Sequence, residues 1–132
     1  MSTGTESHTS AYATADVLPK TFGLYILYVT DWEPAVAFYR DTLGWTLLFE
    51  EPHGWAEFQT GGVRFALHPA GAGQGAPIDT HLSLFVADVD ASIAALAAKD
   101  VKITAQPRLV CEGVRSAAFA DHAGNVFHLN GK

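Results

Sequence analysis

The two halves of the chain repeat one sequence pattern. Val29-Thr-Asp31 and Val86-Ala-Asp88 each end an apolar run, and the same interval separates them from Ala35-Val36 and Ser92-Ile93. Aspartate commonly caps the N-terminus of a helix, so the pattern predicts a strand followed by a capped helix in each half. A pattern repeated in this way indicates a duplicated structural unit. The chain is therefore expected to fold into two copies of one module.

Each half is predicted to contain the element order βαβββ, which makes the fold class α+β. The first half is expected to hold a strand at Phe22–Val29, a helix from Asp31 to about Leu43, and strands at Trp45–Glu50, Trp55–Thr60 and Val63–His68. The second half repeats this order with an apolar strand ending at Val86, a helix at Val89–Lys99, and strands at Val101–Thr104, Arg115–Ala120 and Asn125–Leu129.

These elements define the expected domain organisation. One domain over 21–132 contains two modules, about 21–69 and 80–130, joined by the glycine-rich connector Ala70–Pro77. Residues 1–20 lack a helical period and are interpreted as a flexible tail, in which His8 is given no role.

Composition excludes several classes of function. The chain has 132 residues, 48% of them hydrophobic, which suits one domain that needs no disulfide, and Cys111 is its single cysteine. A net charge of −6 without a basic run argues against nucleic-acid binding. No apolar run approaches the about 20 residues of a membrane span, and no signal peptide is recognised, so a cytoplasmic protein is expected.

Three motifs resemble the vicinal oxygen chelate superfamily, which includes glyoxalase I, methylmalonyl-CoA epimerase, extradiol dioxygenases, fosfomycin-modifying enzymes and bleomycin-resistance proteins. They are the Phe38-Tyr39-Arg-Asp-Thr-Leu43-Gly44 segment after Asp31, the strand His81–Asp88, and the turn Asp121-His-Ala-Gly124-Asn125. The resemblance covers about residues 22–130. It implies that each module forms a curled half-barrel sheet with its helix outside, and that two chains pair as a homodimer, with swapped and unswapped module pairing both open.

The resemblance also implies up to four metal-ligating positions, on the first and last strands of the modules. Here those positions hold Leu24, Ala66, His81 and His128, so only the two histidines can ligate. Because two imidazoles rarely hold an ion alone, His68 is the candidate third ligand; a solvent-facing His68 is the alternative. The expected cofactor is a divalent ion such as Zn²⁺, Fe²⁺, Ni²⁺, Co²⁺ or Mn²⁺, and a metal-free protein is the competing hypothesis.

The resemblance implies a carboxylate on a last strand, which could act as the base in proton abstraction, but here that position holds His128. Catalysis by proton abstraction would therefore need another base. The candidate catalytic residues are His81, His128 and Glu57. A solvated Glu57 at a sheet edge is the alternative interpretation of that glutamate. His53 and His122 are interpreted as exposed turn residues.

Aromatic residues concentrate in the first half and suggest a pocket for a planar or cationic compound. The expected pocket residues are Trp32, Trp45, Trp55 and Tyr25. The leading hypothesis is a lyase, isomerase or oxygenase that acts on a small, oxygen-rich, aromatic or polycyclic metabolite. The alternative is a non-catalytic protein of the bleomycin-resistance type that sequesters a drug or metabolite. No glycine-rich phosphate-binding motif points to a nucleotide.

Overall fold

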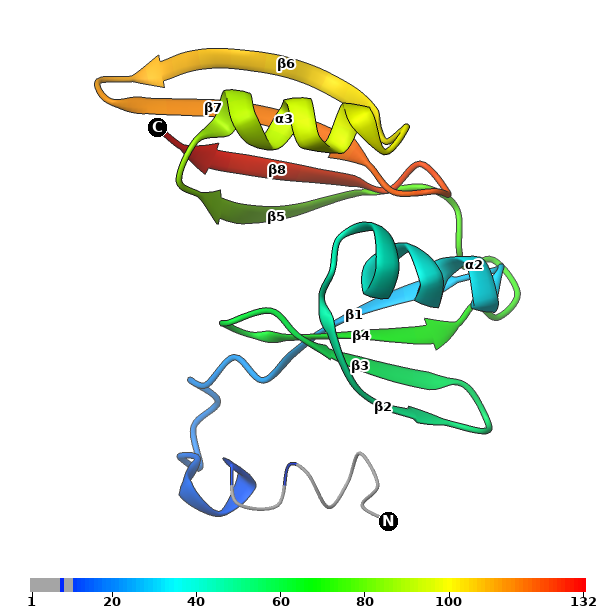
Figure 1. The fold of residues 1–132 in the computed structure, drawn as a ribbon. Coiled ribbons are helices and arrows are strands. Elements are labelled where there is room, and N and C mark those ends of the chain that lie inside the picture. Colours follow the sequence, from blue (N-terminus) through cyan, green and yellow to red (C-terminus); the bar gives the residue numbers. More distant parts are fainter. Residues whose placement is uncertain (1–7, 9–10) are drawn as a thin grey trace. The chain divides into compact units, whose positions relative to one another are not determined.

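The computed structural model describes residue 8 and residues 11–132, which form two compact units divided after Gly75. Each unit contains one four-stranded sheet with helical structure between its first two strands (Figure 1). The strand order is β1-β4-β3-β2 in the first unit and β5-β8-β7-β6 in the second. The expected α+β fold of two βαβββ modules is confirmed. Of the proposed tail at residues 1–20, residues 1–7 and 9–10 lie outside the described residues, and residues 11–14 are helical; the flexibility of this segment stays a prediction.

The first unit follows the expected order with a shorter α-helix. Its elements are β1 (Leu24–Val29), α2 (Trp32–Ala37), η1 (Phe38–Thr42), β2 (Thr46–Glu51), β3 (Trp55–Gln59) and β4 (Arg64–Pro69). The helix widens into the π-helical turn η1, and Gly44 follows with a φ of 75°, a conformation that favours glycine. β1 runs parallel to β4, and the other neighbouring pairs are antiparallel.

Alternation along the strands separates the two faces of the first sheet. Buried side chains such as Leu27, Phe58 and Phe65 belong to the core, with Tyr39 of η1 lying 4.9 Å from Phe65 between ring centroids. Ile26 points to the opposite face and remains exposed. The helical segment therefore packs on the face that carries Phe65, and the opposite face carries both the exposed Ile26 and the buried Ala66.

The second unit repeats this arrangement. Its elements are β5 (Asp79–Val86), α3 (Val89–Ala98), β6 (Lys102–Cys111), β7 (Val114–Ala120) and β8 (Val126–Gly131). β6 extends well past Thr104, where the sequence predicted the strand to end. It tolerates Pro107 because β6 is the edge strand and its register with β7 shifts repeatedly around that residue.

The turn Asp121–Asn125, one of the three motifs that resemble the superfamily, has a structural role. The buried Asp121 carboxylate accepts hydrogen bonds from the backbone N–H groups of Ala123 and Asn125, both at 2.9 Å, and from the Asn125 amide at 3.0 Å. Asn125 in turn accepts a 3.0 Å hydrogen bond from the backbone N–H of Ile78. These contacts fix the turn before β8 and tie it to the entry of β5, so they position the two strands that carry His81 and His128.

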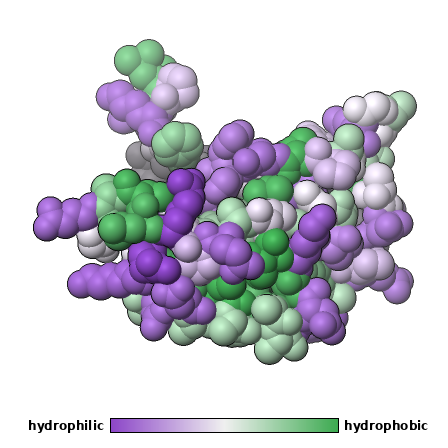
Figure 2. Space-filling model, turned by 90° about the horizontal axis from the view of Figure 1, so that it is seen from above, coloured by the Kyte–Doolittle hydropathy of each residue, from purple (hydrophilic) through white to green (hydrophobic). Residues whose placement is uncertain are grey.

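Several large apolar side chains remain at the surface, including Phe85, which is 88% exposed. In the view of Figure 2, hydrophobic side chains appear in patches between hydrophilic ones. Among the described residues, no helix is both long enough and apolar enough to cross a membrane.

Candidate functional site

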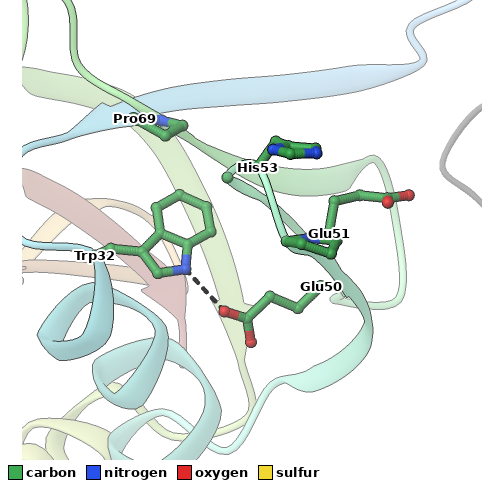
Figure 3. A pocket seen from close by; sticks show the side chains of 7 residues that line it. Trp32, Glu50, Glu51, His53 and Pro69 are labelled. Carbon is green, nitrogen blue, oxygen red and sulfur yellow. Dashed lines mark hydrogen bonds between the residues drawn. The ribbon is translucent and has the colours of Figure 1, made fainter.

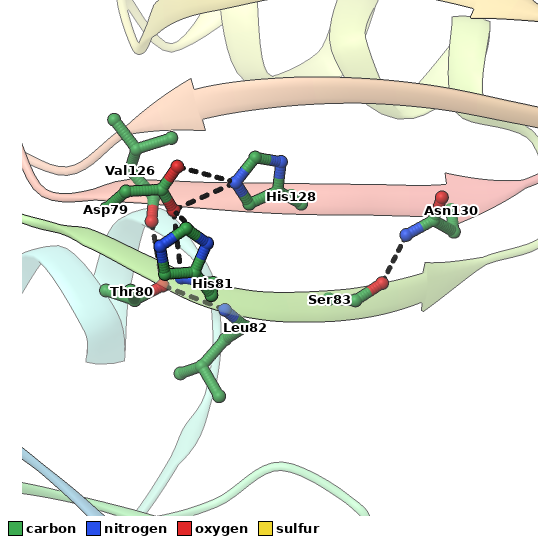
Figure 4. A network of polar contacts seen from close by, with 8 residues as sticks. All are labelled: Asp79, Thr80, His81, Leu82, Ser83, Val126, His128 and Asn130. Carbon is green, nitrogen blue, oxygen red and sulfur yellow. Dashed lines mark hydrogen bonds and ion pairs between the residues drawn. The ribbon is translucent and has the colours of Figure 1, made fainter. Parts of the chain in front are cut away.

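An irregularity in β5 creates the polar cluster of the second unit. Asp79 pairs with Val126 of β8, and Ser83 pairs with His128, so four residues of β5 span the same length as two of β8. The extra residues form a bulge in which His81 adopts a positive φ of 57°. The bulge brings the side chains of Asp79 and His81 together beside His128 (Figure 4).

Asp79 is the centre of this cluster. It accepts hydrogen bonds from the His81 backbone N–H at 2.8 Å and from His128 Nε2 at 2.9 Å, while His81 Nδ1 lies 3.6 Å from its Oδ1. The His81 N–H and then the His128 imidazole hold the pKa of Asp79 below its ordinary value, so the carboxylate is ionised at neutral pH. The two imidazole rings are parallel, with centroids 6.3 Å apart.

The cluster fits a divalent metal ion. One ligand atom from each of Asp79, His81 and His128 lies within 4.8 Å of the others, and two imidazoles with a carboxylate form a common donor set for Zn²⁺ or Fe²⁺. Ligands about 2.0–2.1 Å from one ion in tetrahedral geometry are about 3.4 Å apart, close to the separations found around Asp79. The His81 side chain is 83% exposed, which leaves room for a further ligand from solvent or substrate.

Asp79 was not among the residues that the sequence analysis proposed. The available signal was an acidic residue two positions before His81, but regular alternation along a strand does not predict the bulge that brings the three side chains together. His68, the expected third ligand, lies in the first unit, where its Nδ1 is 2.7 Å from the carbonyl oxygen of Pro69. Its role as a ligand stays a prediction.

Glu57 lies on β3, in the interior of the first sheet, and is completely buried. The interpretation of a solvated glutamate at a sheet edge is wrong, because β3 is flanked by β4 and β2. Its carboxylate accepts hydrogen bonds from Arg64 at 2.8 Å, Trp55 Nε1 at 3.1 Å and His8 Nε2 at 2.8 Å. Burial alone would raise the pKa of Glu57, but the hydrogen bonds from His8, Arg64 and Trp55 outweigh it and lower the pKa.

The expected pocket residues occupy different environments. Tyr25 stacks on Phe65 with centroids 6.0 Å apart, and Trp45 meets the same ring edge-on at 5.1 Å, so both take part in aromatic packing within the first unit. Trp55 contributes its N–H to the buried glutamate on its own strand. Trp32 lines a pocket elsewhere in the unit.

That pocket measures about 510 Å³ and is lined by Trp32, Glu50, Glu51, Pro52, His53, Gly54 and Pro69. The indole Nε1 of Trp32 donates a 2.8 Å hydrogen bond to Glu50, which orients the ring along one wall (Figure 3). His53 belongs to the exposed turn between β2 and β3, and His122 lies in the exposed turn before β8. An aromatic wall beside carboxylates suits a compact organic cation.

The sequence of the chain matches the family model of the Glyoxalase/Bleomycin resistance protein/Dioxygenase superfamily over residues 21–129. The chain belongs to this superfamily. No curated protein matches the sequence.

Solved structures resemble the chain over more than four fifths of its length. A glyoxalase/bleomycin resistance protein from Streptomyces sp. CB03234 is 30% identical, with a TM-score of 0.68 over 83% of this chain and 99% of its own. The antibiotic-binding protein TnmS3 from Streptomyces sp. CB03234 is 28% identical, with a TM-score of 0.73 over 88% and 98%. A superfamily member from Sphaerobacter thermophilus DSM 20745 is 25% identical, with a TM-score of 0.75 over 88% and 100%.

The superfamily resemblance singles out four potential metal-ligating positions, and the structure shows the surroundings of these residues. His81 and His128 share one polar cluster in the second unit. Leu24 and Ala66 in the first unit offer no metal-ligating atom, and Ala66 is completely buried. The potential ligands are therefore distributed unequally between the two otherwise equivalent modules.

Proposed function

We propose that the chain is a small-molecule enzyme that holds a divalent metal ion through Asp79, His81 and His128. The observation that carries this proposal is the convergence of two imidazoles and an ionised carboxylate at one bulge. When bound there, a divalent ion supplies Lewis acidity toward neighbouring oxygen atoms of an organic substrate.

The side chains beside the cluster support an oxygen-rich substrate. Ser83 pairs in register with His128, and Asn130 donates a hydrogen bond to the Ser83 hydroxyl (Figure 4). This hydroxyl and amide offer polar contacts next to the proposed metal ligands. The substrate class is accordingly a compact metabolite with adjacent oxygen atoms, and the reaction is of the lyase, isomerase or oxygenase type.

Glu57 is poorly suited to accept a proton in such a reaction. Its lowered pKa makes it a weak base, and the hydrogen bonds from Arg64, Trp55 and His8 occupy its oxygens. His81 and His128 are the remaining candidates for a catalytic role, either as metal ligands or as proton acceptors.

Metal titration tests the proposal directly. Protein purified without a histidine tag is expected to bind one equivalent of Zn²⁺ or Fe²⁺, measured by calorimetry and elemental analysis. Asp79→Asn, His81→Ala and His128→Ala should each weaken binding at least tenfold. His53→Ala and His122→Ala are matched controls because both histidines are exposed in turns. Unchanged binding in the three cluster variants would contradict the proposal.

A second candidate function is non-catalytic binding of an antibiotic-like compound. It is supported by the 28% identity to a protein described as antibiotic-binding and by the pocket beside Trp32. Screening aromatic and cationic antibiotics by fluorescence and thermal shift would separate the two candidates. A sequestering protein should bind its ligand equally well with a metal chelator present and in the His81→Ala variant, whereas the metal-dependent enzyme should not.

The same proposal includes a homodimer. Phe85 on β5 is 88% exposed, and burial of a large aromatic ring by a second chain would be favourable. Light scattering at micromolar concentration is expected to give twice the mass of the chain, and a monomer would contradict this expectation.

A further inference from the structure

Glu57 is a buried carboxylate that the proposed metal centre does not use. It lies in the first unit, opposite Ala66 of β4, on the sheet face that also carries Ile26. An ionised carboxylate persists in such a place only when hydrogen-bond donors surround it. The identity of these donors indicates what the site can bind.

Two of the three donors belong to the sheet itself. Trp55 precedes Glu57 by two residues on β3 and donates to Oε1, while Arg64 lies on the adjacent β4 and donates to Oε2. Because strand pairing fixes both residues, these contacts form part of the module.

The third donor comes from outside the module. His8 lies 49 residues before Glu57 in the sequence, and its Nε2 also reaches Oε2, at 2.8 Å. Since a carboxylate only accepts hydrogen bonds, the imidazole must present an N–H there. The His8 side chain is 14% exposed, so most of its surface is covered by the protein. The sheet thus provides two donors and the N-terminal segment provides the third.

Charge defines the chemistry of this third position. Arg64 already neutralises Glu57, so the position requires a hydrogen-bond donor and does not require a full positive charge. A flat ring suits this position, because the imidazole of His8 occupies it, with Tyr12 edge-on at 5.8 Å between ring centroids and the Tyr12 hydroxyl 3.2 Å from His8 Nδ1. A heteroaromatic nitrogen base with one N–H meets both requirements.

We propose that Glu57, together with Trp55 and Arg64, forms a binding site for an imidazole-like nitrogen base, and that His8 occupies this site in the free chain. A small-molecule ligand that carries such a group binds by displacing His8. His8 therefore acts as a built-in competitor for a site in the first unit. This site uses none of the proposed metal ligands, which all belong to the second unit.

Rescue of a His8→Gly variant with free imidazole tests the proposal. The reporter is the indole N–H signal of Trp55 in ¹H–¹⁵N NMR spectra, assigned with a Trp55→Phe variant, because this N–H donates to Glu57. Imidazole should shift the signal saturably in His8→Gly and return it toward its wild-type position. The wild-type chain should require at least tenfold more imidazole, because His8 competes for the site.

Two comparisons make the result specific. At about pH 8.5 both imidazole and 1-methylimidazole are neutral, but only imidazole can donate an N–H, so 1-methylimidazole should bind at least tenfold more weakly. A His122→Gly variant, which removes an exposed histidine from the turn before β8, should bind imidazole no better than the wild type.

Two results would overturn the proposal. One is equal imidazole affinity in His8→Gly and the wild type; the other is equal affinity of His8→Gly for imidazole and 1-methylimidazole. A Glu57→Gln change in the His8→Gly background should also abolish the imidazole-dependent shift. The methylated probe tests the proposal even if that double variant does not fold, because it leaves Glu57 unchanged.

Discussion

Replacing Glu57 with alanine should be among the most damaging single substitutions in the first unit. The change removes a completely buried carboxylate and leaves the donors of His8, Trp55 and Arg64 without their common acceptor. It also leaves the Arg64 guanidinium without the opposite charge that it contacts at 2.8 Å. Unpaired polar groups in a folded interior lower the free energy of unfolding.

The magnitude follows from the number and exposure of these contacts. Hydrogen bonds to a charged group contribute about 1.5–3 kcal/mol each, so three would give about 4.5–9 kcal/mol if water could replace none. The Arg64 side chain is 32% exposed and that of His8 is 14% exposed, so water compensates for part of the loss. We therefore expect a loss of about 3–5 kcal/mol, the range observed when one partner of a buried ion pair is removed.

Urea denaturation followed by circular dichroism provides the measurement. Glu112→Ala is the matched control, because Glu112 is exposed in the turn between β6 and β7 and should change stability by less than about 0.5 kcal/mol. If Glu57→Ala costs less than about 1 kcal/mol, the three hydrogen bonds contribute little and the argument for a structured carboxylate site fails.

Three further predictions concern pH, helix capping and strand packing. Because the folded-state pKa of Glu57 is lowered, its ionisation stabilises the fold above the unfolded-state pKa, and this contribution is lost as the pH falls through the folded-state value. The stability advantage of the wild type over Glu57→Gln should therefore shrink below the ordinary glutamate pKa of 4.5, measured by urea titration across pH. Asp88→Ala should cost about 1 kcal/mol in thermal or urea unfolding and Asp31→Ala less, since only the Asp88 side chain caps its helix; equal costs would refute the capping argument. Gly131→Ala should cost about 1–3 kcal/mol, because an added Cβ would lie 1.9 Å from the Val86 carbonyl oxygen; unchanged stability would show that the strand end moves freely.

Local sequence patterns were sufficient to predict the duplicated modules. Strand alternation, helix capping and glycine turns act over a few residues, so they can be read without knowing the fold. The predicted helix at Val89–Lys99 lies within one residue of α3, and Asp88 caps it as expected. The predicted side-chain cap of the first helix is wrong, because Asp31 makes no capping hydrogen bond. The limit of β6 could not be read in this way, because pairing with β7 sustains a strand that contains Pro107.

The candidate metal site was only partly predictable. The resemblance to the superfamily identified His81 and His128, because their distances from Asp88 and Gly124 are fixed in the sequence. It gave no reason to include Asp79, because this residue is not one of the four superfamily positions and the bulge in β5 cannot be predicted from strand alternation. The bulge in β5, produced by pairing with β8, decides where all three side chains lie.

The sequence by itself determined the module type, the helix and strand order, and the two histidines at superfamily positions. Only the tertiary structure decided that Glu57 is buried and that His8 is its partner. Glu57 is buried because the order of the strands places β3 between β4 and β2. The contact between His8 and Glu57 joins residues 49 positions apart, and no repeating sequence pattern predicts it. Periodicity reports which face of an element a side chain occupies, whereas burial and partnership depend on which segments that face meets after folding.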